Sequence, residues 1–200
     1  MMANVDSIID RLLEGTAASY SRADARSNLR RLVEAAREAV AEVGMKVTAH
    51  DIARRAGVGI GTFYRRVRSR DLLLEAVLIE TVEDMISLAR AAKDDCDPWR
   101  GFQAFAMQYV QLRMTSCGLN AALGDTALNL EPQLRQLREA LRSMVARAQA
   151  AGAMRKDVSW EDVAFLLSCV QPARQTIGLN AAQTQWQRTL AVLLDGLIAR

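Results

Sequence analysis

The sequence predicts an all-α fold, and three observations support this. Hydrophobic residues make up 50% of the 200 residues, whereas proline occurs 3 times and glycine 11 times, so long uninterrupted helices are possible. Alanine, leucine, arginine and glutamate, which favour helices, are abundant. No segment alternates β-branched and polar residues in the way that indicates a strand. We therefore expect helices throughout the chain.

Residues 48–74, TAHDIARRAGVGIGTFYRRVRSRDLLL, predict a helix, a tight turn, a short helix and the start of a third helix. Ile52 and Ala56 recur at helical spacing, and Gly57 ends that run. Phe63 begins a second apolar face that can fold back on the first. This arrangement is typical of a DNA-binding helix-turn-helix, whose second helix enters the major groove. Double-stranded DNA is therefore the expected partner.

The ends of these helices carry their own signals. Thr48 is placed to cap the first helix, with Asp51 completing a capping box. Gly59 is expected to cap the second helix and Ser69 the third. Gly61, in the first turn of the second helix, has no side chain to hold the backbone away from a phosphate. A helix that begins after Ser69 would offer an anion site at its N-terminus. The helix dipole disfavours a cation such as Arg70 at this end, and a bound phosphate would offset that unfavourable interaction.

The charge distribution also indicates a polyanionic partner. Residues 22–72 hold 12 Lys and Arg against 6 Asp and Glu, whereas the remaining residues hold 14 basic and 17 acidic side chains. A basic head on a mildly acidic body is expected when one end of a molecule meets nucleic acid. A solvated basic face without a partner is the alternative, and the turn chemistry favours DNA.

The segment from residue 26 to about 77 resembles the N-terminal domain of the tetracycline-repressor (TetR) family of bacterial regulators. AGVGIGTFYRR carries the most specific part of the resemblance, and MRKDVSWEDVAFLL extends it weakly. Val67 and Arg68 stand where the family usually has an aromatic residue and a proline, and Ile60 where many relatives have lysine. The resemblance implies a homodimeric regulator that binds a palindromic operator as a repressor and is released by a small-molecule effector. An activator, or an orphan regulator without an effector, is the alternative.

The exposed side of the second helix is expected to read DNA. Thr62 and Arg65 lie opposite Phe63 and are the expected base readers, whereas Tyr64, Thr48 and Arg70 are expected to meet phosphates. The full set of predicted DNA contacts is Thr48, Gly59, Ile60, Gly61, Thr62, Tyr64, Arg65, Arg66, Ser69 and Arg70.

We expect an N-terminal extension over 1–21, the three-helix DNA-binding domain over 22–72, and a helical effector-binding and dimerisation domain over 73–200. The extension is expected to be an extra helix or a mobile arm, without an assigned function. The helices expected after the DNA-binding motif span 70–93, 97–118, 132–151, 159–177 with a kink at Pro172, and 184–200, with a shorter helix or a loop over 119–130.

The resemblance implies that the last two helices pair with their copies in a four-helix bundle. Two apolar stripes are compatible with this, although each could equally be ordinary core. The candidate interface residues are Val163, Leu166, Leu167, Val170, Leu190, Leu193, Leu194 and Leu197.

The aromatic and sulfur-bearing side chains of the C-terminal part could line an effector chamber, or could be plain core. The candidates are Trp99, Phe102, Phe105, Tyr109, Arg113, Phe165 and Cys169. Their composition favours an apolar or aromatic effector.

The sequence shows no pattern that is typical of a catalytic site or a metal site. The single histidine, His50, lies in the helix-turn-helix, and the three cysteines are widely spaced. GVGIG follows a helix rather than a strand, so it is not a nucleotide-binding loop. We therefore expect no enzyme activity, cofactor or metal. The sequence also lacks a signal peptide and an apolar run of about 20 residues, so we expect a cytoplasmic protein without a membrane span.

Overall fold

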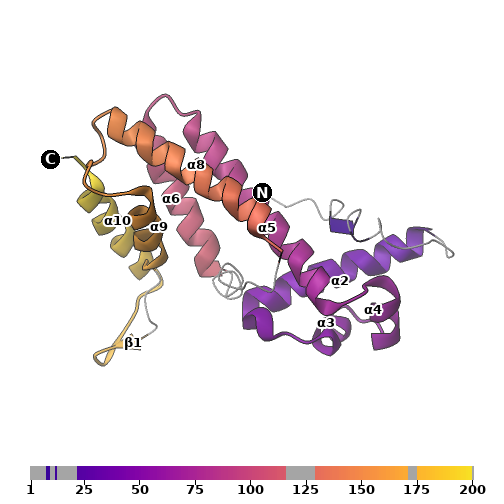
Figure 1. Ribbon diagram of the computed structural model, residues 1–200. Coiled ribbons are helices and arrows are strands. Elements are labelled where there is room, and N and C mark those ends of the chain that lie inside the picture. The colour runs from indigo at the N-terminus through magenta and orange to yellow at the C-terminus, as the bar shows by residue number, and fades with distance from the viewer. Residues whose placement is uncertain (1–7, 10–11, 13–21, 116–128, 171–174, 200) are drawn as a thin grey trace. The chain divides into compact units, whose positions relative to one another are not determined.

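The computed structural model describes residues 8–9, 12, 22–115, 129–170 and 175–199 (Figure 1). The chain forms two compact units. The N-terminal unit comprises the residues up to Asp84 together with Thr115–Leu134, and the C-terminal unit comprises Met85–Met114 and Arg135–Arg200. The described elements are almost all helices, which confirms the predicted all-α class. Among the described helices, none is long and apolar enough to cross a membrane.

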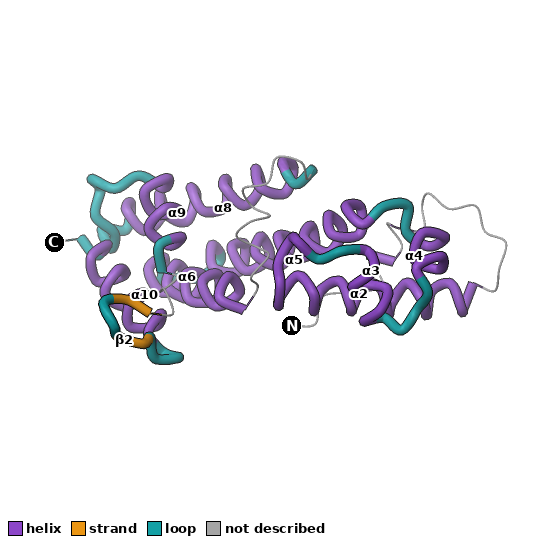
Figure 2. The backbone as a smooth tube through the Cα atoms, turned by 90° about the horizontal axis from the view of Figure 1, so that it is seen from below, coloured by secondary structure: helices purple, strands orange, loops and turns teal. Residues whose placement is uncertain are grey.

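The N-terminal unit is built on α2 (Arg22–Val43), which is followed by the short 3-10 helix η1 (Gly44–Lys46). Helices α3 (Ala49–Arg55) and α4 (Ile60–Arg66) both contact α2 and each other, as Figures 1 and 2 show. The first part of α5 (Arg70–Lys93) belongs to the same unit. Its buried core includes Leu29, Leu32, Val33, Ala36, Ile52, Ala53, Phe63, Val67, Leu73, Leu74 and Val77.

Local signals fix both ends of α3. Thr48 accepts a hydrogen bond at Oγ1 from the Asp51 N–H (3.1 Å), and the Asp51 carboxylate accepts one from the Thr48 N–H (3.2 Å), so the predicted capping box is confirmed. At the other end, Gly57 adopts a φ of +63°, and Val58 N–H donates to the Ala53 carbonyl oxygen (3.0 Å). This left-handed glycine closes the helix and turns the chain toward α4.

A partly buried ion pair joins α2 to α5. Arg37 donates from Nη2 to the Glu80 carboxylate, and the Glu80 side chain is 8% exposed. Among the described residues, Glu80 is the only charged residue that is buried. Its Oε1 has no hydrogen-bond partner among these residues. Burial raises the pKa of nearby Asp84, which the positive charge of Arg37 partly offsets. The pair therefore links α2 to α5 within the N-terminal unit.

Three described residues of the N-terminal extension pack on this unit. Ile8 and Ile9 are fully buried, and Leu12 is half-buried. Leu12 lines a groove of about 300 Å³ together with Arg66, Val67, Arg68, Leu72, Glu75, Ala76 and Ile79. This part of the extension thus contributes to the packing behind α4 and the start of α5.

The C-terminal unit contains the rest of α5, most of α6 (Pro98–Thr115) and of α8 (Glu131–Ala150), and the whole of α9 (Trp160–Ser168) and α10 (Gln185–Leu197). Ser159 and Asp162 form a second capping box at the start of α9. The core of this unit includes Ala89, Phe102, Phe105, Ala106, Val110, Leu141, Met144, Val145, Ala148, Met154, Val163, Leu167, Leu190, Leu194 and Leu197.

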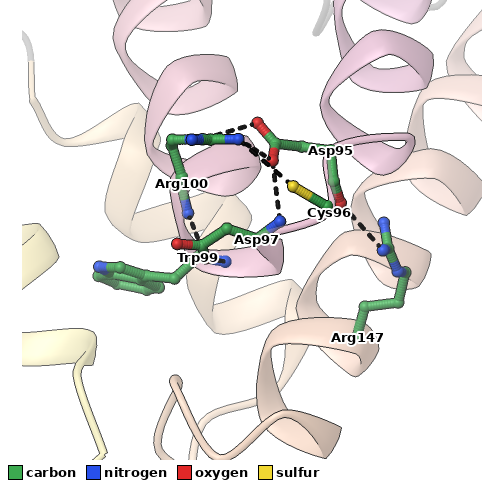
Figure 3. A network of polar contacts seen from close by, with 6 residues as sticks. All are labelled: Asp95, Cys96, Asp97, Trp99, Arg100 and Arg147. Carbon is green, nitrogen blue, oxygen red and sulfur yellow. Dashed lines mark hydrogen bonds and ion pairs between the residues drawn. The ribbon is translucent and has the colours of Figure 1, made fainter.

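A polar network holds the corner between α5 and α6 (Figure 3). Arg100 donates to the Asp95 carboxylate from Nε (3.1 Å) and Nη2 (2.8 Å), and these bonds lower the pKa of Asp95 to about 2. Arg147 on α8 donates to the Asp95 carbonyl oxygen (3.2 Å). A Cβ at Gly101 would lie 2.3 Å from the Ala92 carbonyl oxygen, so only glycine allows the two helices to approach this closely.

The helix predicted over 159–177 is wrong in its second half. Helix α9 ends at Ser168, and an antiparallel hairpin follows, with β1 (Gln175–Thr176) paired to β2 (Leu179–Asn180). The two turn residues, Ile177 and Gly178, have φ angles of +42° and +80°, which no helix accommodates. Pro172, the predicted kink, lies outside the described residues.

The other predicted helices agree more closely with the observed helix bounds. The helix over 70–93 is confirmed, and α8 begins within one residue of Pro132 and is closed by Gly152 with a φ of +71°. Helix α10 begins after Thr184 but ends at Leu197, because Ile198 is extended and forms a bridge with Met154. Most of the predicted 119–130 segment lies outside the described residues.

Candidate DNA-binding surface

The two faces of α4 separate core from surface. Phe63 and Val67 are buried, whereas Tyr64 and Arg65 are exposed and Thr62 is half-buried. The Tyr64 ring, 55% exposed, stands edge-on to Phe63 with ring centroids 5.2 Å apart. The apolar face therefore anchors α4 while the opposite face stays accessible to a large partner.

A hydrogen bond joins Thr62 and Arg65 on the accessible side of α4. Arg65 donates from Nη2 to Thr62 Oγ1 at 3.0 Å. This bond orients the guanidinium without using all of its donors, because arginine has five N–H groups. An oriented guanidinium with free donors can bind the O6 and N7 acceptors of a guanine.

The glycines at the start of α4 leave its backbone uncovered. A Cβ added at Gly59 or at Gly61 would meet no described heavy atom within 4 Å. Gly59 caps α4 without a side chain, and its carbonyl oxygen accepts from the Thr62 N–H (2.8 Å). At these two positions no side chain covers the backbone at the start of α4.

Thr48 and Arg70 are engaged within the protein. The Thr48 hydroxyl lies 2.6 Å from the Asp51 carboxylate, and hydrogen bonds from Thr48 lower the pKa of Asp51. Arg70 donates from Nε to the Val47 carbonyl oxygen (2.6 Å), from Nη2 to that of Met45, and from Nη1 to Asp71 (2.5 Å). The Arg70 guanidinium at the start of α5 thus already has two carbonyl oxygens and a carboxylate as partners within the protein.

The remaining predicted DNA contacts include Ser69, Ile60 and Arg66, whose surroundings in the structure differ. Ser69 is half-buried and caps α5 by accepting from the Leu72 N–H at Oγ (3.2 Å), as predicted. Ile60 is half-buried at the first residue of α4. Arg66 points toward the groove behind α4, and its buried Nε has no hydrogen-bond partner among the described residues.

Long-range contacts reveal basic residues whose roles the sequence did not indicate. Arg31 on α2 donates from Nη2 to the Gly57 carbonyl oxygen (3.1 Å), which supports the turn between α3 and α4. Arg55 pairs with Glu42 on α2 (2.7 Å). Both contacts join residues distant in sequence, so no local pattern could have identified them.

The predicted effector residues do not gather at one place. On α6, Phe102 and Phe105 are buried in the core, stacked with half-buried Trp99 (5.6 Å) and Tyr109 (5.5 Å) respectively. Arg113 lies over the Tyr109 ring at 5.5 Å. In contrast, Phe165 is 74% exposed on α9, and Cys169 is exposed just beyond it. The α6 residues thus face the interior, whereas the two α9 residues face outward.

Most residues of the predicted dimer stripes point into the core of their own unit. Leu193 is half-buried and Leu166 is 38% exposed. Buried in the core are Val163, Leu167, Val170, Leu190, Leu194 and Leu197. These six side chains share one buried cluster with residues of α6 and α8.

Comparisons with known families give a consistent result. Residues 32–77 match the tetR family of bacterial regulatory proteins, and residues 97–199 match the C-terminal domain of SbtR-like transcriptional regulators. No curated protein matches the chain.

Solved structures of TetR regulators share this fold. A TetR regulatory protein from Mycobacterium vanbaalenii is 30% identical, with 89% of this chain and 99% of that chain covered and a TM-score of 0.59. A TetR regulator from Streptomyces coelicolor is 24% identical (84% and 97% covered, TM-score 0.60), and the ketosteroid regulator KstR2 of Mycobacterium tuberculosis is 20% identical (86% and 96%, 0.63). The chain is therefore a DNA-binding transcriptional regulator of the TetR family.

Proposed function

We propose that this regulator is a homodimeric repressor that binds a palindromic operator and leaves it when a small molecule binds its C-terminal domain. The observation that supports this most is the accessible face of α4, where Arg65 is oriented by Thr62 beside two glycines that leave the backbone open. We retain 22–72 as the DNA-binding domain and 73–200 as the effector-binding and dimerisation domain. Because chromosomal DNA lies in the cytoplasm, we place its action there.

We assign different roles to the residues of this face. Arg65, with Thr62, reads bases in the major groove, since a bidentate guanidinium distinguishes guanine from other bases. Phosphates are bound by Tyr64, by Thr48 and Ser69 at the helix starts, and by the backbone at Gly59 and Gly61. We assign to Ile60, Arg66 and Arg70 a role in positioning α4. Ile60 adds an apolar contact near the DNA backbone, and the two arginines add positive charge there.

Dimerisation involves the outward faces of α9 and α10. Phe165, Leu166 and Val192 are large apolar side chains on these faces, and Phe165 and Val192 are 74% and 72% exposed. Exposed apolar groups on adjacent helices favour association with a second copy. A two-fold dimer presents two copies of α4, which is what a palindromic operator requires.

We place the effector along α6, beside the row formed by Trp99, Phe102, Phe105 and Tyr109. Arg113 lies at the half-buried end of this row and would favour an aromatic ligand that carries a negative group. Helix α5 is continuous from the DNA-binding unit into the C-terminal unit, so a ligand against α6 can bias its position. The ligand must distinguish the two states by about 1–3 kcal/mol.

The decisive experiment measures DNA binding by fluorescence anisotropy on the promoter regions next to its own gene, with a random duplex as the control. A specific, salt-dependent affinity for an inverted repeat supports the proposal, and equal affinity for both duplexes contradicts it. Reporter transcription from that promoter, with and without the regulator, separates a repressor from an activator. A screen of aromatic acids for release of the operator separates an effector-controlled regulator from an orphan.

A further inference from the structure

The β1–β2 hairpin has an unusual turn. Gln175 pairs with Asn180 and Thr176 with Leu179, so two residues connect the strands. Both turn residues have positive φ, at +42° for Ile177 and +80° for the glycine after it. This is the geometry of a type I′ turn, which favours asparagine followed by glycine. The second position fits this preference, whereas a β-branched residue at the first position is disfavoured.

The isoleucine at the turn is therefore not explained by the hairpin itself. Asparagine at this position would suit the backbone better and would remove an apolar group from water. Ile177 is 92% exposed and Leu179 is 63% exposed, and every residue from 176 to 184 is exposed. Figure 1 shows the hairpin reaching away from α9 and α10, so its tip is not covered by the core of its own unit.

A hairpin of this kind needs a surface to pack on. An isolated two-stranded hairpin is only marginally stable in water, and adjacent exposed apolar side chains mark an interaction site. The hairpin connects α9 to α10, whose outward faces carry Phe165 and Val192. The apolar groups of the hairpin thus belong to the same chain segment as the proposed dimer face.

The helices alone offer fewer exposed residues than a standard dimer interface uses. Specific interfaces use about 20–30 residues from each partner. Helix α9 has 9 residues and α10 has 13. Five of these 22 residues are buried in the core of their own unit, and four more, Trp160, Ala164, Trp186 and Leu193, are partly buried against it. The outward faces therefore fall short of a standard interface, and the hairpin is the neighbouring segment that can supply the rest.

We propose that the β1–β2 hairpin is a dimerisation arm, whose tip packs Ile177 and Leu179 onto a second copy of this chain. This inference rests on the proposed homodimer. Two-fold symmetry then requires each copy to give one arm and to receive one. Contact of its side chain with the partner would account for the unfavourable residue at the turn.

The test compares dimer dissociation constants of the full chain, measured by sedimentation velocity over a dilution series. Ile177→Asn suits the type I′ turn, so we expect its thermal unfolding to be unchanged or higher when measured as monomer, while dimer affinity falls at least tenfold. Val43→Asn is the matched control, because Val43 is an exposed valine (54%) in the N-terminal unit. It should dimerise like the wild type.

The outcomes separate the two proposals. A wild type that stays monomeric at tens of micromolar overturns the homodimer and the arm with it. A dimeric wild type with an equally tight Ile177→Asn dimer overturns the arm alone and indicates that the hairpin binds something else or nothing. Ile177→Gly, which also fits the positive φ, must weaken the dimer in the same way, and circular dichroism must show both variants folded.

Discussion

Arg70, at the first residue of α5, donates from Nε to the main-chain carbonyl oxygen of Val47, 2.6 Å away and just before the cap of α3. A second donor of the same guanidinium reaches the carbonyl oxygen of Met45. Arg70 thereby joins the start of α5 to the segment that leads into α3. Any shift of α5 would act directly on the helix that supports α4.

Replacing Arg70 with alanine should therefore destabilise the protein as well as weaken DNA binding. Two carbonyl oxygens would lose a charged donor, which costs about 1–3 kcal/mol. Urea unfolding of the full chain measures this loss. Arg70→Lys should recover little of it, because an ammonium group lacks the fork that reaches both carbonyls.

An unchanged urea midpoint in Arg70→Ala, together with a loss of affinity for all duplexes, would show that Arg70 acts only on phosphate. The same experiment thus distinguishes its role within the fold from the role proposed at the DNA.

Arg65→Ala should reduce discrimination between operator and mismatched duplexes by about 1–3 kcal/mol at the base pairs that it reads. Tyr64→Phe removes only a hydroxyl from the same face, so it should weaken binding to all sequences by a small and equal factor. Anisotropy titrations on the operator, on single-mismatch variants and on random DNA separate these patterns. Equal losses on operator and random DNA in Arg65→Ala would refute its base-reading role.

Thr62→Val tests whether orientation of the guanidinium matters. Valine keeps the shape of threonine but cannot accept the 3.0 Å bond from Arg65. We expect a partial loss of the same discrimination that Arg65→Ala removes, and little further loss when both changes are combined. Additive effects in this double-mutant cycle would mean that the two residues contact DNA independently.

Gly61→Ala should have opposite effects on folding and on binding. Alanine within a helix is more stable than glycine by about 0.5–1 kcal/mol, and a Cβ here meets no described atom within 4 Å. The new methyl group would stand between the backbone and a phosphate, so we expect the operator affinity to fall about tenfold, or 1.4 kcal/mol. Thermal unfolding and anisotropy on one sample measure both.

Gly196→Ala is the matched control, since Gly196 lies in α10 with equally open surroundings. Gly196 lies one turn after Val192 on the proposed dimer face, so the DNA affinity of this variant is compared at concentrations where sedimentation shows it to be dimeric; stability should then rise while that affinity stays unchanged. A Gly61→Ala variant that binds DNA as tightly as the wild type would show that the backbone at α4 does not approach the phosphates.

The helix-turn-helix could be predicted closely because its signals are local. Thr48 bonds to Asp51 three residues later, Gly57 closes α3 with its own φ, and Ser69 caps α5. Each of these interactions lies within one turn of the residue that makes it, so spacing in the sequence is sufficient.

The C-terminal unit was harder to predict because both sides of its last helices are apolar. On α9, Val163 and Leu167 are buried, whereas Phe165 and Leu166 are exposed, and no periodicity distinguishes the two faces. Packing against α6 and α8 decides which face is inside. Contacts such as Arg37 to Glu80, 43 residues apart, likewise depend on tertiary structure alone.

The Asp95 network predicts how stability depends on pH. Hydrogen bonds from Arg100 hold the pKa of Asp95 at about 2, below its ordinary value of 3.8. The unfolded chain therefore binds more protons than the folded protein between these values, so stability rises with pH in this window. This contribution is fully present above about pH 4 and is lost as the pH falls toward 2.

We expect the wild type to lose thermal stability steeply between pH 4 and pH 2 and Asp95→Asn to lose it less steeply, since asparagine does not titrate. Asp95→Asn should also be less stable at pH 7, because Arg100 then loses its charged acceptor. Asp94→Asn, which changes the exposed neighbouring carboxylate, should keep the wild-type slope. If Asp95→Asn and the wild type show parallel pH profiles, Asp95 does not couple its ionisation to folding, and the corner between α5 and α6 is held by Arg147 and helix packing instead.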